Sequence, residues 1–149
     1  MIRKAILQDA RQIHRLLLTY AKDGLVLSRS LMEIFESIRD FYVYVEQDRV
    51  IGAAALNICW EDLAEVRSLV VHEEFGGKGI GKQLVEACLS EARQLGIGRV
   101  FALTYQQQFF EKLGFRVIEK SELPQKIWGD CIKCAKFPEC DEIALSVTL

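Results

Sequence analysis

The arrangement of hydrophobic and polar residues along the chain predicts a series of short strands. Most of these stretches alternate apolar and polar side chains or are rich in branched and aromatic residues, as is typical of strands. The predicted strands are residues 2–7, 41–46, 49–58, 64–71, 99–104, 115–120 and 142–149. Only Gln47 and Asp48 separate the second of these stretches from the third, so we expect the two strands to form a hairpin.

Other stretches repeat hydrophobic residues with the spacing of a helix. The predicted helices are residues 10–24, 30–40, 81–96 and 106–114. We expect Asp9 to be the N-cap of the first helix and Gly24 to end it. Ser30 and Glu33 have the spacing of a capping box at the start of the second helix.

The mixed order of strands and helices predicts the fold class. Six to seven strands with about four helices, without repeats or an obvious linker, indicate one α+β or α/β domain over residues 1–149. The long stretch 121–141 has no regular pattern. Stretches of this length in compact domains are often functional, so we interpret this one as a loop beside the ligand site.

The composition allows a sizeable core but no broad positive field. Of the 149 residues 50% are hydrophobic, and 19 Lys and Arg against 21 Asp and Glu give a net charge of −2. We therefore expect the protein to bind neither nucleic acid nor a membrane surface, and any anion to be held locally. The sequence has no signal-peptide pattern and no run of about 18 apolar residues, which predicts a soluble cytoplasmic protein.

Four glycines lie between a predicted strand and a predicted helix, at Gly76, Gly77, Gly79 and Gly81. The first amide groups of a helix lack partners and carry the positive end of its dipole, so a glycine-rich approach can admit a phosphate. Lys78 and Lys82 add local charge. A tight turn without a ligand is the alternative. Neither a P-loop nor a dinucleotide-binding fingerprint fits this spacing.

The stretch from "VRSLVVHEEFGGKGIGKQLVEACL" to "FFEKLGF" resembles the GNAT superfamily of N-acetyltransferases. The resemblance implies a GNAT-like fold with a mixed, mostly antiparallel sheet, and acetyl-CoA as the co-substrate. It also implies a set of coenzyme-binding residues. These are Leu69, Val70, Val71, Gly76, Gly77, Lys78, Gly79, Ile80, Gly81, Lys82 and Phe110. Gly76 departs from the Gln or Arg usual in the family, which removes one side-chain contact.

A narrower resemblance links "LSRS", "AEVRSLVV" and "ELPQKIW" to the acetyltransferase domain of bacterial N-acetylglutamate synthases. It implies an amino-acid acceptor, glutamate in arginine biosynthesis, with Arg29 and Lys126 pairing with the carboxylates. We add Ser30 and Arg67 to this acceptor site. An arginine suits a carboxylate because its planar fork can bind both oxygens. The alternative for Arg29 and for Lys126 is an ordinary solvated charge.

The chemistry of acetyl transfer requires a base, because an α-amine is mostly protonated at neutral pH. Glu65 is our candidate base, and a polar residue at a strand end is the alternative interpretation. Many relatives carry a tyrosine as proton donor where this chain has Phe110. Tyr105, which stands where the synthases tend to carry an arginine, is our candidate donor in its place, with a structural tyrosine as the alternative.

The five cysteines are odd in number, which favours free thiols in a reducing compartment over a disulfide framework. Cys59 and Cys88 fall in apolar patterns, so we expect them in the core. Cys131, Cys134 and Cys140 could bind zinc if a fourth ligand joined them, serve a redox role, or pack within a loop over the substrate. We favour the loop, and we expect no metal to be required.

Three functions are consistent with the sequence. The first is direct acetyl transfer to the α-amine of an amino acid, with glutamate preferred. The second keeps the chemistry but changes the acceptor to a polyamine, a peptide or a protein N-terminus. The third is a non-catalytic module that responds to coenzyme A or a metal. The sequence leaves open whether the protein acts as a monomer or as a homodimer.

Overall fold

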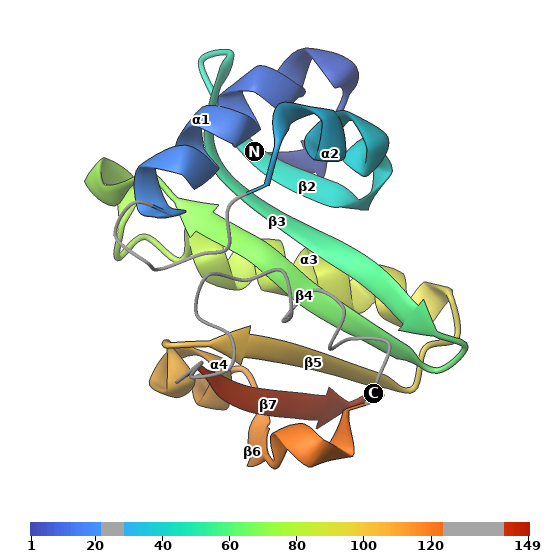
Figure 1. Cartoon of the computed structure of the whole chain (residues 1–149). Coiled ribbons are helices and arrows are strands. Elements are labelled where there is room, and N and C mark those ends of the chain that lie inside the picture. The colour runs from blue at the N-terminus through green and yellow to red at the C-terminus, as the bar shows by residue number, and fades with distance from the viewer. Residues whose placement is uncertain (22–28, 124–141) are drawn as a thin grey trace.

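The computed structural model describes residues 1–21, 29–123 and 142–149. Within them, seven strands form one sheet in the order β1-β2-β3-β4-β5-β7-β6 (Figure 1). The strands are β1 (Ile2–Lys4), β2 (Phe41–Glu46), β3 (Arg49–Trp60), β4 (Leu63–Val71), β5 (Arg99–Thr104), β6 (Arg116–Ile118) and β7 (Ile143–Thr148). All neighbours are antiparallel except β4 and β5, which are parallel. The mixed, mostly antiparallel sheet predicted from the sequence is confirmed.

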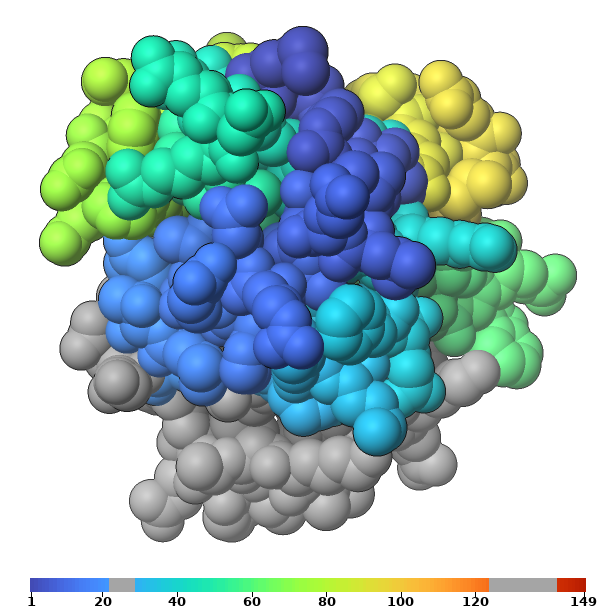
Figure 2. Space-filling view, turned by 90° about the horizontal axis from the view of Figure 1, so that it is seen from above, coloured from blue at the N-terminus to red at the C-terminus, as the bar shows by residue number. Residues whose placement is uncertain are grey.

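Four α-helices cover the sheet in the described part of the chain. They are α1 (Ala10–Ala21), α2 (Leu31–Glu36), α3 (Ile80–Gln94) and α4 (Gln107–Lys112). Helices α1 and α2 lie on one face of the sheet and α3 on the other (Figure 1). Figure 2 shows α1 and α2 side by side, forming one surface over their face. No helix within the described residues has both the length and the apolar character needed to cross a bilayer.

The hydrophobic core is divided between the two faces because side chains alternate along each strand. On β3, Ala54 and Leu56 pack in the cluster of α3, whereas Ala53 and Ala55 pack in the cluster of α1. Cys88 of α3 is fully buried, as predicted. Cys59 near the end of β3 is half-buried and packs against the smaller cluster that includes Leu63 and Phe101, so it lies at the margin of the core.

The approach of α3 to the sheet is close at Gly52 of β3. A β-carbon at Gly52 would lie 3.1 Å from Cδ1 of Leu84, 3.2 Å from Cγ2 of Ile80 and 3.3 Å from the carbonyl oxygen of Val70. Any larger residue at this position would push these neighbours away by a few tenths of an ångström. The sheet therefore fixes where the N-terminus of α3 lies, since Ile80 is its first residue.

The local signals at the first two helices are confirmed in part. The Ser30 hydroxyl accepts a hydrogen bond from the Glu33 amide at 3.1 Å, and the Glu33 carboxylate accepts one from the Ser30 amide at 3.0 Å. This capping box agrees with the prediction. The helix, however, ends at Glu36, where the Ser37 hydroxyl donates to the Glu33 carbonyl, and a 3-10 turn follows over Ile38–Asp40.

Asp9 does not act as the predicted N-cap of α1. Its carboxylate accepts from the Ile6 amide at 2.8 Å and forms two hydrogen bonds with the Arg3 guanidinium, at 2.7 and 3.1 Å. Asp9 thus ties β1 to the start of α1. Burial tends to raise the pKa of this carboxyl, but the hydrogen bonds from Arg3 and Ile6 outweigh it and hold the pKa below its usual range.

Two irregularities of β4 open the sheet. Ala53 pairs with Val70 and Ala55 with Arg67, so Ser68 and Leu69 together face the single residue Ala54. This is a β-bulge, and Ser68 has a φ of 56°, in the left-handed region. The parallel ladder between β4 and β5 extends only over Leu63–Glu65 and Arg99–Phe101. Beyond that ladder the two strands separate (Figure 1).

Candidate active site

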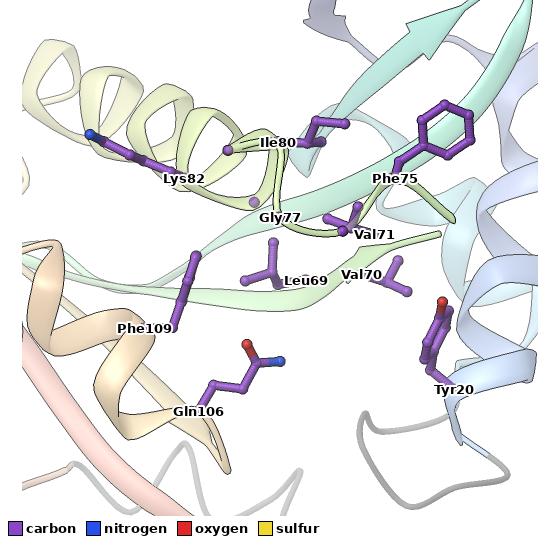
Figure 3. A pocket seen from close by; sticks show the side chains of 13 residues that line it. Tyr20, Leu69, Val70, Val71, Phe75, Gly77, Ile80, Lys82, Gln106 and Phe109 are labelled. Carbon is purple, nitrogen blue, oxygen red and sulfur yellow. The ribbon is translucent and has the colours of Figure 1, made fainter. Parts of the chain in front are cut away.

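A cavity of about 450 Å³ lies where β4 and β5 have separated, next to the N-terminus of α3. We call it the glycine-loop cavity. Its volume is within the usual range for sites that bind a small molecule or cofactor. The lining residues are Tyr20, Leu69, Val70, Val71, Phe75, Gly76, Gly77, Gly79, Ile80, Gly81, Lys82, Gln106 and Phe109 (Figure 3).

The glycine loop presents backbone amides to this cavity. Gly77 and Gly79 both have a φ of 77°, which side chains other than glycine rarely adopt. Gly79 is the N-cap of α3 and supplies no side-chain hydrogen bond to the first turn. A β-carbon on Gly77 or Gly79 would meet no atom within 4 Å, so each faces open space. The loop therefore has the room, and the free amides of a 15-residue helix, that an anion needs.

Gly81 is close to Phe109 of α4. A β-carbon at Gly81 would lie 3.3 Å from the Phe109 ring, so the missing side chain lets this ring line the cavity. Phe110, which we predicted as the coenzyme contact, is only 3% exposed. Its ring packs edge to face against Phe109 and Phe115, with centroids 5.1 Å apart in each pair. The structure thus assigns Phe110 to the core and Phe109 to the cavity.

The two lysines of the loop point to different places. Lys82 lines the cavity, and its amino group points away from Tyr20, which lies across the cavity (Figure 3). Lys78 is exposed, does not line the cavity, and places its amino group 5.3 Å from the centroid of the Phe75 ring. The Lys78 side chain turns back onto Phe75, and the predicted contact of this residue with the coenzyme stays a prediction.

A second cavity, of about 170 Å³, adjoins the bulge of β4. We call it the arginine cavity, because Arg29 and Arg67 both line it. The remaining lining residues are Glu33, Glu36, Ser37, Asp40, Phe41, Ala55 and Ser68. Ser68 borders this cavity and Leu69 borders the glycine-loop cavity. Consecutive residues of one bulge thus line the two cavities.

Charges of both signs face the arginine cavity. The side chain of Arg29 is only 13% exposed and lies 3.8 Å from the Glu33 carboxylate. Burial raises the pKa of the Asp40 carboxyl, although the positive charges of Arg67 and Lys4 oppose the shift. The cavity therefore offers cations for a carboxylate and carboxylates for an ammonium group. The Ser30 hydroxyl caps α2, and Ser30 is not among the lining residues of this cavity, so its predicted contact with substrate stays a prediction.

Glu65 is a buried acid where the β4–β5 ladder ends. It pairs with Asn57 of β3 and Phe101 of β5, and its side chain is 12% exposed. Its Oε1 lies 4.0 Å from Nη1 of Arg67. The alternation along β4 places the side chains of Glu65 and Arg67 on the same face of the strand. Glu65 lines neither the glycine-loop cavity nor the arginine cavity.

The other predicted site residues are placed as follows. Tyr105 is half-buried directly after β5 and precedes Gln106, which does line the glycine-loop cavity. Lys126 and the cysteines Cys131, Cys134 and Cys140 lie outside the described residues. Among the described residues, no cluster of three or more His, Cys, Asp and Glu side chains could hold a metal ion.

Sequence reasoning missed several lining residues. The helical spacing could have predicted that Tyr20 faces inward, since this residue continues the buried stripe of α1 by one turn beyond Leu16 and Leu17. No sequence feature predicts the position of Ser68, because this residue lies within an apolar strand pattern and nothing in that pattern indicates a bulge. Gln106 and Phe109 belong to a helix that was predicted, but its pattern did not show which aromatic side chain points inward.

Comparison with known proteins identifies the family. The chain matches the model of the Acetyltransferase (GNAT) family over residues 7–115. It is 46% identical over 148 residues to an uncharacterised N-acetyltransferase from Chlorobaculum tepidum, covering 99% of this chain and 96% of the relative. It is 33% identical over 133 residues to the amino-acid acetyltransferase of Mycobacterium tuberculosis, covering 87% of this chain and 76% of the relative.

A solved structure agrees with this match. The N-acetylglutamate synthase from Neisseria gonorrhoeae, complexed with coenzyme A and N-acetyl-glutamate, is similar to this chain with a TM-score of 0.91 and 26% identity. The match covers all of this chain and 35% of the synthase chain. The chain therefore belongs to the GNAT family of acetyltransferases. It is an N-acetyltransferase that uses acetyl-CoA, which confirms the predicted class and co-substrate.

The role of the glycine loop can be tested with the variant Gly79→Ala. We expect this change to weaken coenzyme A binding about ten-fold or more, because a β-carbon would enter the cavity and strain a left-handed backbone. The matched control is Gly96→Ala at the other end of α3. Gly96 has a φ of 82° and open space around its α-carbon, but it lies outside the cavity.

Both glycine variants should lose about 1 kcal/mol or somewhat more of unfolding free energy, measured by urea denaturation. Only Gly79→Ala should lose affinity for coenzyme A in titration calorimetry. Equal affinities in the two variants would show that the loop amides do not hold the coenzyme.

Proposed function

We propose that the protein transfers the acetyl group of acetyl-CoA directly to the α-amine of an amino acid, with glutamate preferred. The observation that carries this proposal is the arginine cavity, which is lined by two cations and by Ser68, the neighbour of Leu69 in the glycine-loop cavity. Formation of N-acetylglutamate, a step of arginine biosynthesis, would then be its role. The amino-acid acetyltransferases and the synthase among its relatives support this choice of acceptor.

The glycine-loop cavity suits the donor. In this proposal the amides from Gly77 to Lys82 bind the diphosphate at the N-terminus of α3, and Lys82 adds a positive charge. The apolar wall formed by Leu69, Val71 and Phe109 suits the pantetheine arm. The exposed edge of β4 beyond Glu65 would then orient that arm, since the ladder to β5 has already ended there.

The arginine cavity suits the acceptor. A dicarboxylic amino acid has two carboxylates to pair, and Arg29 and Arg67 are the cations of this cavity. Lys126 is proposed to bind one carboxylate as well; it lies outside the described residues. Glu33, Glu36 and Asp40 line the same cavity and can hold the ammonium group before it loses its proton.

The proposed mechanism needs one base and one acid. Glu65 accepts a proton from the ammonium group, directly or through a water molecule, while Arg67 keeps its carboxylate in place. The amine nitrogen then attacks the thioester carbon, and the negative charge that forms on the thioester oxygen is stabilised by backbone amides of β4 near the bulge. When the C–S bond breaks, Tyr105 donates a proton to the departing thiolate.

Direct transfer is favoured over a covalent acetyl-enzyme. A cysteine nucleophile must be a thiolate, and burial raises the pKa of Cys88 to about 12. Cys88 is therefore a thiol at neutral pH, and it is fully buried in the α3 core. Cys59 is half-buried at the end of β3 and lines neither cavity. The described cysteines thus offer no suitable nucleophile.

The acceptor can be identified by measuring thiol release from acetyl-CoA. The purified protein would be offered glutamate, aspartate, glutamine, a polyamine and a short peptide in parallel. We expect glutamate to give the highest kcat/KM, because it alone in this panel combines an α-amine with two carboxylates at the longer spacing. A polyamine or peptide that exceeded glutamate would overturn the proposed acceptor while leaving the acetyltransferase class intact.

Arg29→Ala tests the carboxylate contact. Losing a charge-assisted hydrogen bond should raise the KM of the acceptor about ten- to a hundred-fold. The KM of acetyl-CoA should stay within about two-fold of that of the unchanged protein. Arg39→Ala is the matched control, because Arg39 is an exposed arginine of the following 3-10 turn that does not line the cavity. Equal changes in the two KM values of Arg29→Ala would remove the arginine from the acceptor site.

Glu65→Gln tests the base. The substitution keeps the shape of the side chain but removes its ability to accept the proton, so we expect kcat to fall about a hundred-fold or more. Both KM values should change little. The control is Glu61→Gln, an exposed acid in the turn between β3 and β4. If Glu65→Gln turned over as fast as the unchanged protein between pH 6 and pH 9, Glu65 would have no part in proton transfer.

A further inference from the structure

A third cavity lies on the outer side of α3, facing the end of α4. It has a volume of about 320 Å³, and we call it the outer basic cavity. The lining residues are Lys82, Glu86, Leu89, Arg93, Lys112 and Leu113. The four residues from α3 are spaced at i, i+4, i+7 and i+11, so they form a single stripe along the helix.

The outer basic cavity is positive although the whole chain is negative. Three of its side chains are cationic and one, Glu86, is anionic. Among the described residues, no ion pair within 4 Å involves Lys82, Arg93 or Lys112. Three unpaired cations on a chain with a net charge of −2 favour the binding of an anion at this place.

Lys82 connects this cavity with the glycine-loop cavity, because it lines both. Figure 3 shows its amino group turned away from Tyr20 and the interior of the glycine-loop cavity. An anion that Lys82 contacts from the outer side is therefore close to any diphosphate at the loop. Lys112 reaches the same cavity from the last turn of α4.

We propose that the outer basic cavity binds the 3′-phosphate on the ribose of coenzyme A. This inference rests on the proposed donor site, in which the diphosphate lies on the glycine loop and the pantetheine arm follows β4. The nucleotide must then leave the loop on the side opposite to that arm. One ribose separates the 3′-phosphate from the diphosphate, so Lys82 can contact both phosphate groups while Lys112 binds the outer one.

Arg93 has a smaller role in this arrangement. Eleven residues separate it from Lys82, which corresponds to about 16 Å along the helix axis. Lys82 and Lys112 are therefore the direct contacts, and Arg93 adds a longer-range positive potential. The class of ligand is a phosphate monoester next to a diphosphate, which distinguishes coenzyme A from its dephosphorylated precursor.

The test compares the binding of coenzyme A and dephospho-coenzyme A by titration calorimetry at low salt, without any acceptor. We expect the protein to bind coenzyme A about ten-fold more tightly, in keeping with a charge-assisted contact at an open site. In Lys112→Gln this preference should shrink to about two- to three-fold, because coenzyme A is bound less tightly while dephospho-coenzyme A is unaffected. Arg93→Gln should reduce the preference less than Lys112→Gln does.

Arg116→Gln is the matched control. It also removes one positive charge, from an exposed side chain of β6 that does not line any of the three cavities. Its preference for coenzyme A should equal that of the unchanged protein. Equal binding of the two ligands by the unchanged protein, or equal weakening of both by Lys112→Gln, would overturn the inference. Because no acceptor is present, an acceptor other than glutamate would overturn the proposed function without affecting this result.

Discussion

The bulge at Ser68 and Leu69, together with the early end of the β4–β5 ladder, is the constraint on which the site depends. A parallel pair that continued to Val71 would bring β5 against β4 and close the glycine-loop cavity. The extra residue in β4 also bends the strand, so that Ser68 borders one cavity and Leu69 the other. In the proposed function an attacking amine and a thioester must meet within bonding reach, and adjacent residues of one bulge would provide such a place.

The second requirement is a fixed position for the N-terminus of α3. The dipole and the free amides of a helix act only within its first turn, so a small displacement of α3 would lose the anion site. Gly52 lets Ile80 and Leu84 pack directly on β3, and Gly81 lets Phe109 pack against the first turn. The glycines therefore have two different functions: Gly77 and Gly79 allow a left-handed backbone, whereas Gly52 and Gly81 allow close contacts.

The sequence predicted those features that depend on local interactions. The capping box of Ser30 and Glu33 and the stripe of α3 that includes Cys88 involve residues a few positions apart, so their spacing alone identified them. The glycine loop was predicted for the same reason. Asp9 was assigned wrongly because its partner, Arg3, is on a neighbouring strand, and an ion pair with it replaced the expected cap.

The features that the sequence did not predict depend on tertiary packing. Phe109 and Phe110 are adjacent and chemically identical, and the packing of Phe110 in the core, against Phe115 among others, distinguishes the buried ring. The bulge at Ser68 shifts the register between β3 and β4. The apolar pattern of both strands is continuous, so no residue type in the sequence indicates the bulge. The arginine cavity combines residues from α2, β2, β3 and β4. The sequence analysis named Arg29 and Arg67 for one acceptor site, but no motif indicated the acids Glu33, Glu36 and Asp40 beside them.

The mixed charge of the arginine cavity bears on the choice of acceptor. A polyamine carries only positive charge, so it could pair with Glu33, Glu36 and Asp40 but would leave Arg29 and Arg67 facing like charges in a partly desolvated space. An acceptor with carboxylates can instead pair with the arginines, while Glu33, Glu36 and Asp40 face its ammonium group. Because burial raises the pKa of Asp40, its carboxyl gains a proton at a higher pH than an exposed aspartate would. Acidification would therefore weaken the hold on the ammonium group before it weakened the hold of the arginines on the carboxylates.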